Sequence, residues 1–79
     1  MPPAATKIAL MAAICVTVNG EEHDIRTELD LTGLLQHFSL SEKRIAIELN
    51  GTIVTRTEWA KTIVTEGDKI EVVHFVGGG

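Results

Sequence analysis

Apolar and polar residues alternate along several short stretches of the chain, a pattern typical of half-buried β-strands. The first is the clearest, since Ile14, Val16 and Val18 are separated by small or polar residues. The same alternation predicts a returning strand through His23, Ile25 and Thr27 and three further strands, at residues 45–49, 52–55 and 69–76. In the third strand, Ile45, Ile47 and Leu49 share one face, and Ala46 and Glu48 share the other.

Glycine-containing turn signals separate these predicted strands. Asn19-Gly20 follows the first strand and Asn50-Gly51 follows the third. Because Asn-Gly favours the tight two-residue turns of hairpins, each pair predicts a hairpin. Glu66-Gly67-Asp68 predicts one more turn just before the last strand.

One segment has helical rather than alternating spacing. Its apolar residues recur every three or four positions: Leu31, Leu34, Leu35 and Phe38. This spacing predicts a short helix, with Asp30 or Thr32 available as its N-cap. A second, briefer helical turn is expected around Trp59.

The resulting order of elements is β-β-α-β-β-turn-β. It predicts an α+β fold of the β-grasp (ubiquitin-like) class, with a mixed sheet of four to five strands and one main helix packed across one face. Along the chain we expect a flexible N-terminal leader at residues 1–13, the β-grasp domain at residues 14–76 and a flexible glycine tail at residues 77–79.

The length and net charge of the chain limit the functions that we expect of it. At 79 residues the chain forms one domain, and a domain of this size buries only roughly 60 % of its unfolded surface. A deep active-site cleft is therefore not expected. The net charge of −4 argues against a nucleic-acid partner, which usually requires a basic face. No stretch approaches the ~20 apolar residues of a membrane helix, so no membrane partner is expected.

The number of cysteines and the spacing of the histidines argue against a disulfide-bonded or metal-binding protein. Cys15 is the single cysteine, so neither an internal disulfide nor a multi-cysteine zinc site can form within the chain. This usage fits a reducing, cytoplasmic setting, and we interpret Cys15 as a small packing group in a strand. His23, His37 and His74 lack metal-ligand spacing, and we predict no metal site.

The last three residues, Gly77, Gly78 and Gly79, follow an apolar strand with no spacer. Three glycines span about 10 Å when extended, and without Cβ atoms they form a thread that fits a narrow channel. The carboxylate at the tip needs activation, typically as a mixed anhydride with AMP, before a nucleophile attacks it. The chain has no phosphate-binding loop, so ATP and magnesium would be used by a partner enzyme. The alternative is an inert or disordered terminus.

The sequence resembles the ThiS family, the sulfur carrier proteins of thiamin biosynthesis, over residues 16–79. The most specific stretch is LNGTIVTRTEWAKTIVTEGDKIEVVHFVGGG. Family-like features within it are the Asn-Gly turn, Arg56 and Trp59 in TRTEW, the Gly67-Asp68 pair and the closing glycines. The leader and the additional Gly77 depart from the usual family pattern.

The resemblance implies a carrier that is not itself an enzyme and binds no cofactor. A ubiquitin-activating-like (E1-like, ThiF-like) adenylyltransferase would convert the Gly79 carboxylate to an acyl-adenylate, with Gly78 as its slender neighbour. A sulfur donor system would then replace AMP to give a thiocarboxylate. The carrier would deliver this sulfur to a ThiG-like thiazole synthase. Three alternatives remain open: the small subunit of molybdopterin synthase, a protein modifier that conjugates through Gly79, and an interaction domain with an inert tail.

Several other residues carry weaker signals. Val73 and Phe75 fall on the strand face opposite Ile70 and Val72, and with Ala46 they would form an exposed apolar patch suited to docking a partner. The alternative is that Phe75 tucks against the sheet edge. Trp59 is interpreted mainly as a packing residue. Arg56 is expected to face the acidic Glu58 and Glu66, or a partner.

Overall fold

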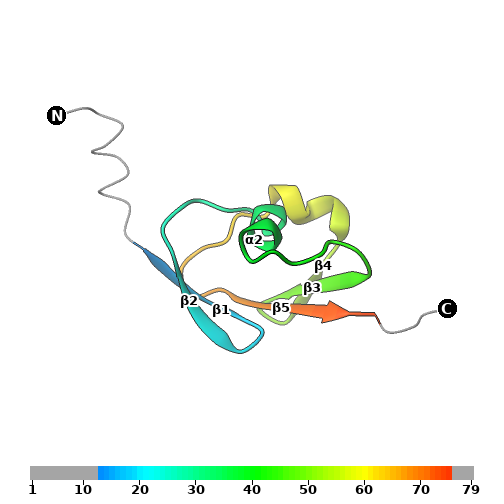
Figure 1. Ribbon diagram of the computed structural model, residues 1–79, viewed down its shortest axis with the longest axis horizontal. Coiled ribbons are helices and arrows are strands. Elements are labelled where there is room, and N and C mark those ends of the chain that lie inside the picture. The colour runs from blue at the N-terminus through cyan, green and yellow to red at the C-terminus, as the bar shows by residue number, and fades with distance from the viewer. Residues whose placement is uncertain (1–12, 76–79) are drawn as a thin grey trace.

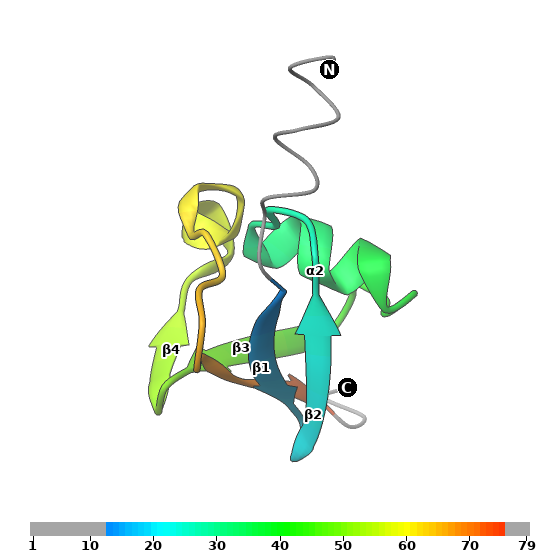
Figure 2. The same ribbon diagram turned by 90° about the vertical axis from the view of Figure 1, so that its left-hand side faces the viewer.

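The computed structural model describes residues 13–75, which form one mixed five-stranded sheet. The strands lie in the order β2-β1-β5-β3-β4. A helix, α2, and a 3-10 helix, η1, lie on one side of the sheet (Figures 1 and 2). The elements run as follows: β1 (Ile14–Val18), β2 (Glu21–Ile25), α2 (Leu31–His37), β3 (Ile45–Leu49), β4 (Thr52–Val54), η1 (Arg56–Lys61) and β5 (Lys69–His74).

This architecture confirms the predicted β-grasp class, and the bounds of three strands differ from expectation. β4 ends at Val54 instead of residue 55, and β2 ends at Ile25 instead of Thr27. β2 begins at Glu21 because the two-residue turn pairs Glu21 directly with Val18. β5 ends at His74, and Val76 lies outside the described residues. The predicted tail, residues 77–79, also lies outside them, as does the predicted leader except for Ala13.

Both Asn-Gly pairs form the predicted hairpin turns. Asn19 and Asn50 have φ values of 50° and 53°, and the glycine after each has φ of 85°. Positive φ at both central positions is the signature of the type I′ turn, whose twist matches that of the flanking strands. These conformations explain why asparagine followed by glycine occurs at both hairpins.

Helix α2 begins at a side-chain cap. The Asp30 carboxylate accepts a hydrogen bond of 2.7 Å from the Gly33 backbone N–H, which satisfies one of the free amides of the first turn. Asp30, rather than Thr32, is therefore the N-cap. The apolar face of the helix is fully buried, with Leu31, Leu34 and Leu35 each at 0 % exposure.

The core lies between α2 and the inner face of the sheet. Alternate residues of the three central strands point into it, as their spacing predicted: Val16, Val18, Ile45, Ile47, Ile70 and Val72. Trp59 and Val64 close the side of the core near η1. Among the described residues, no helix has the length and apolar content needed to cross a membrane.

Truncating Leu34 tests the importance of this interface. Leu34→Ala removes a fully buried side chain and leaves a cavity, so we expect the free energy of unfolding to fall by roughly 2–5 kcal/mol. Urea denaturation followed by circular dichroism measures the change. Ile53 is 65 % exposed, and Ile53→Ala should change stability by no more than about 0.5 kcal/mol. Equal losses in the two variants would contradict the assigned core.

Candidate functional site

Strand β5 is the centre of the sheet and the element that leads to the C-terminal glycines. It pairs in parallel with β1 and antiparallel with β3. Its inward residues, Ile70 and Val72, are buried against the core. The start of β5 is paired on both sides, and its later residues are paired with β3 alone.

The two hairpin asparagines also bond β5 through their side chains. Asn19 Oδ1 accepts a hydrogen bond of 2.7 Å from the Val72 N–H. Asn50 Oδ1 accepts one of 2.9 Å from the Lys69 N–H. Sequence reasoning assigned these asparagines only to turns, and the Asn-Gly signal contains no information about the distant strand.

The start of β5 is held by a buried carboxylate. Asp68 is only 9 % exposed, and its Oδ1 accepts from Asn50 Nδ2 at 3.0 Å. Its Oδ2 accepts from the Thr65 N–H at 2.8 Å and from Thr65 Oγ1 at 3.2 Å. Burial of a carboxylate is tolerated when its oxygens are hydrogen-bonded in this way. The Gly67-Asp68 pair therefore ties the last turn to the β3–β4 hairpin.

The outer face of the sheet carries the predicted apolar patch. Val73 is 43 % exposed and Phe75 is 57 % exposed, so Phe75 is not tucked against the sheet edge. Ala46 is half-buried and pairs with Val73 across β3 and β5. We call these three residues the β5 patch. It lies immediately before the C-terminal segment, and its role in partner binding stays a prediction.

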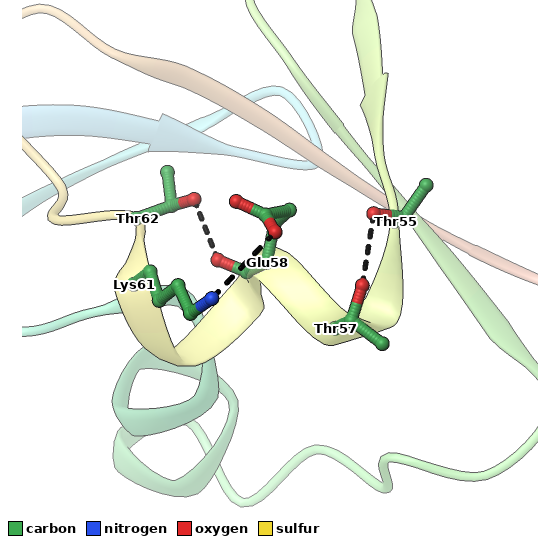
Figure 3. A network of polar contacts seen from close by, with 5 residues as sticks. All are labelled: Thr55, Thr57, Glu58, Lys61 and Thr62. Carbon is green, nitrogen blue, oxygen red and sulfur yellow. Dashed lines mark hydrogen bonds and ion pairs between the residues drawn. The ribbon is translucent and has the colours of Figure 1, made fainter.

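The TRTEW segment supplies the N-cap Thr55 and the first four residues of η1, and polar contacts at the surface hold this turn together (Figure 3). Thr62 Oγ1 donates to the Glu58 carbonyl at 2.7 Å, and Lys61 Nζ lies 4.0 Å from a Glu58 carboxylate oxygen. Thr55 and Thr57 share a hydroxyl–hydroxyl hydrogen bond of 3.4 Å. All of these contacts are exposed, so they shape the segment locally and contribute little stability.

Trp59 is a packing residue, as interpreted from the sequence. It is 2 % exposed, and its indole Nε1 donates to the Val54 carbonyl at 2.9 Å. This bond satisfies the one polar atom of the buried ring.

The expected pairing of Arg56 with Glu58 and Glu66 is wrong. Its guanidinium lies 4.4 Å from the centre of the Trp59 ring and donates to the Glu42 carbonyl at 2.6 Å. Stacking on an aromatic ring suits the planar guanidinium. Glu58 instead approaches Lys61, and Glu66 accepts a hydrogen bond from the Cys15 N–H.

The half-buried Cys15 is poorly suited to act as a nucleophile. Partial burial raises the pKa of its thiol, and the negative charges of Glu22, Asp24 and Glu66 raise it further. A raised pKa lowers the thiolate fraction, which is the reactive form. This environment agrees with the interpretation of Cys15 as a packing group. Within residues 13–75, the histidine, cysteine and acidic side chains form no group of three that could hold a metal ion.

Comparison with known proteins assigns this arrangement to a family. The sequence model of the ThiS family matches residues 10–79. The chain is 32 % identical to the sulfur carrier protein ThiS of Bacillus subtilis, over 78 % of this chain and 96 % of that protein. A crystal structure of the thiamine biosynthesis protein ThiS from Geobacter metallireducens superposes with a TM-score of 0.74 at 32 % identity, covering 84 % of this chain and all of the other.

Two further relatives are much longer proteins. The chain is 38 % identical to a thiazole synthase of Magnetococcus marinus over 81 % of its own length. It is 34 % identical to a thiazole synthase of Paramagnetospirillum magneticum over a segment of the same extent. The chain spans about a fifth of the length of each of these relatives.

The environment of Cys15 predicts a measurable thiol titration. We expect the pH midpoint of Cys15 alkylation by iodoacetamide to lie above that of a cysteine in a short unstructured peptide. Glu66→Gln should lower this midpoint because it removes one of the negative charges that disfavour the thiolate. The glutamine keeps an oxygen that can accept the Cys15 N–H. Glu58→Gln serves as the control and should leave the midpoint unchanged. A midpoint at or below that of the peptide would contradict the described environment.

Proposed function

The chain belongs to the ThiS family of sulfur carriers in thiamin biosynthesis, and from this we propose that Gly79 carries the transferred sulfur as a C-terminal thiocarboxylate. The family match carries the proposal because it extends through the three glycines to residue 79. The proposal requires Gly79 to be the C-terminal residue of the cellular protein.

The proposed chemistry takes place in two steps. A Gly79 carboxylate oxygen attacks the α-phosphorus of ATP, which forms an acyl-adenylate and releases pyrophosphate. A sulfur nucleophile then attacks the Gly79 carbonyl carbon and displaces AMP, which retains the oxygen that made the first attack. ATP and magnesium are used by a partner adenylyltransferase, and this chain supplies the carboxylate.

The β-grasp body supports this role by its construction. β5 is central in the sheet and ends shortly before the glycines in the sequence, so the body supplies a base for them that pairs with β3 as far as His74. Gly77, Gly78 and Gly79 lack side chains, so they suit a narrow channel in a partner. The raised pKa of the Cys15 thiol argues against this residue as the sulfur-bearing group.

We propose two partner enzymes and a sulfur donor system. The first is a ThiF-like adenylyltransferase, which the mixed-anhydride chemistry requires. The second is a ThiG-like thiazole synthase, to which the carrier delivers sulfur. Two longer relatives that contain a segment similar to this chain bear the name thiazole synthase, which supports this choice. We assign the carrier to the cytoplasm, because its single cysteine fits a reducing compartment.

Intact-mass measurement tests the modification directly. The purified protein is incubated with the ThiF-like enzyme of the same organism, ATP, magnesium, a cysteine desulfurase and cysteine. Exchange of one carboxylate oxygen for sulfur should raise the mass by about 16 Da. A variant lacking Gly79 should show no gain. An unchanged wild-type mass would contradict the proposal, as would rescue of molybdoenzyme activity, rather than thiamin synthesis, in deletion strains.

The β5 patch predicts a docking defect that is separate from folding. Phe75→Ser removes an exposed aromatic side chain next to the C-terminal segment. We expect the carrier concentration that half-saturates the adenylyltransferase to rise roughly tenfold, as for loss of an apolar anchor at an interface. Thermal stability should change little because the ring is already 57 % exposed.

Ile63→Ser is the matched control for this experiment. Ile63 is an apolar residue with 44 % exposure. It lies in the loop between η1 and β5 and forms a bridge with Asp30 at the start of α2, away from the β5 patch. The carrier concentration that half-saturates the adenylyltransferase should be unchanged in this variant. Equal effects of Phe75→Ser and Ile63→Ser would show that the β5 patch is not the docking surface.

A further inference from the structure

The last residues of β5 have a neighbouring strand on one side only. The parallel pairing of β5 with β1 ends at Val18 and Ile70, where β1 enters its hairpin turn. The antiparallel pairing with β3 continues to His74. Figure 1 shows β5 running on toward the C-terminus beyond the turn that joins β1 and β2.

The hydrogen-bond pattern determines which groups of β5 face this gap. Asn50 N–H donates to the Lys69 carbonyl at 2.7 Å, and Phe75 N–H donates to the Arg44 carbonyl at 2.8 Å. Both contacts join odd-numbered positions to the β3 side: Lys69 begins β5, and Phe75 follows its last residue. Because the two sides alternate along a strand, even-numbered residues direct their N–H and C=O groups toward β1. Val72 is the first even-numbered residue beyond the β1 pairing.

Asn19 occupies the position that the next residue of β1 would have filled. Its N–H donates to the Ile70 carbonyl at 2.9 Å, and its side-chain Oδ1 accepts from the Val72 N–H at 2.7 Å. The side chain thus replaces a backbone carbonyl and lengthens the β1–β5 pairing by one hydrogen bond. Glycine or aspartate would also tolerate the φ of 50° at this turn position, so the turn alone does not require the Asn19 amide.

We propose that Asn19 is a positioning residue for sulfur loading, because it fixes the path of β5 from Val72 toward the C-terminal glycines. The inference rests on the proposed function, in which those glycines enter a partner enzyme. With the Asn19 bond intact, the strand is held on both sides until Val72. Without it, the segment after Ile70 keeps only its β3 neighbour, and ordering it in the complex carries a larger entropy cost.

Asn50 provides a stringent control, because its loss also removes the Nδ2 hydrogen bond to the buried Asp68. It occupies the same position in a turn of the same type, and its Oδ1 likewise accepts from a β5 amide. Its partner, Lys69, begins the strand, at the end remote from the glycines. Loss of the Asn50 side chain should therefore destabilise the fold without releasing the segment that precedes the tail.

The kinetic test compares Asn19→Gly with Asn50→Gly, because glycine keeps each turn and removes only the side chain. The assay is carrier-dependent exchange of labelled pyrophosphate into ATP by the ThiF-like adenylyltransferase. Asn19→Gly should raise the half-saturating carrier concentration roughly three- to tenfold with kcat nearly unchanged, since it weakens ordering before chemistry. Asn50→Gly should change the half-saturating carrier concentration less than about twofold. Asn19→Asp retains an acceptor oxygen and should restore most of the affinity.

Amide hydrogen exchange tests the structural half of the inference without any partner. The Val72 amide should exchange at least about tenfold faster in Asn19→Gly than in the wild type. The exchange rate of the Phe75 amide, which donates to the Arg44 carbonyl just before β3, should change less. An unchanged Val72 rate would contradict the positioning role.

The kinetic outcomes separate this inference from the proposed function. If the wild-type chain supports exchange and both glycine variants raise half-saturation equally, Asn19 has no special role and the proposed function stands. If the wild-type chain supports no exchange at all, the proposed function fails, and the positioning role fails with it. A selective effect of Asn19→Gly that Asn19→Asp reverses supports the inference.

Discussion

The structure depends on the pairing of β5 with two neighbouring strands. β5 pairs in parallel with β1 on one side and antiparallel with β3 on the other. β5 is the last element that the structure describes and the central strand of the sheet. Its inward side chains, Ile70 and Val72, complete the core beneath α2. The sheet is therefore complete only when the C-terminal part of the chain has been inserted between β1 and β3. This late, long-range pairing couples the segment before the glycines to the stability of the whole domain.

Side chains from the turns complete this central pairing. The amides of Asn19 and Asn50 bond β5 from its two neighbours, and Asp68 joins the start of β5 to Asn50 and Thr65. In the part of the chain that the structure describes, no buried side-chain polar atom lacks a partner. Fully satisfied buried polar contacts specify one arrangement of strands, because any other register would leave them unpaired.

The same construction suits a carrier. The inner face of β5 supplies the core, the outer face presents Val73 and Phe75, and the strand leads directly toward the glycines. A partner that recognises the β5 patch would contact the chain just before the glycines in the sequence. In the proposed function, the body would contribute affinity and orientation, and the partner would contribute the activation chemistry.

Local sequence patterns predict most of the secondary structure of this protein. Alternation defined the strands and placed Val73 on the outer face, the Asn-Gly pairs defined both hairpins, and the spacing of leucines defined α2. These features depend on neighbouring residues, whose geometry is set by backbone sterics and by the period of each element. Membership of the ThiS family also followed from residues readable in the sequence, although the structural placement of Gly79 lies outside the described residues.

Only the tertiary structure decided the contacts between distant residues. The Asn19–Val72 hydrogen bond spans 53 positions, and the contact of Arg56 with the Glu42 carbonyl spans 14. The charges of Glu58 and Glu66 suggested different partners for Arg56, but the buried ring of Trp59 and an exposed carbonyl lay closer once the chain had folded. Sequence patterns encode the period of an element and not the order in which strands meet. The side-chain hydrogen bonds that fix β5 between its neighbours therefore depend on the tertiary structure and are not encoded in any local pattern.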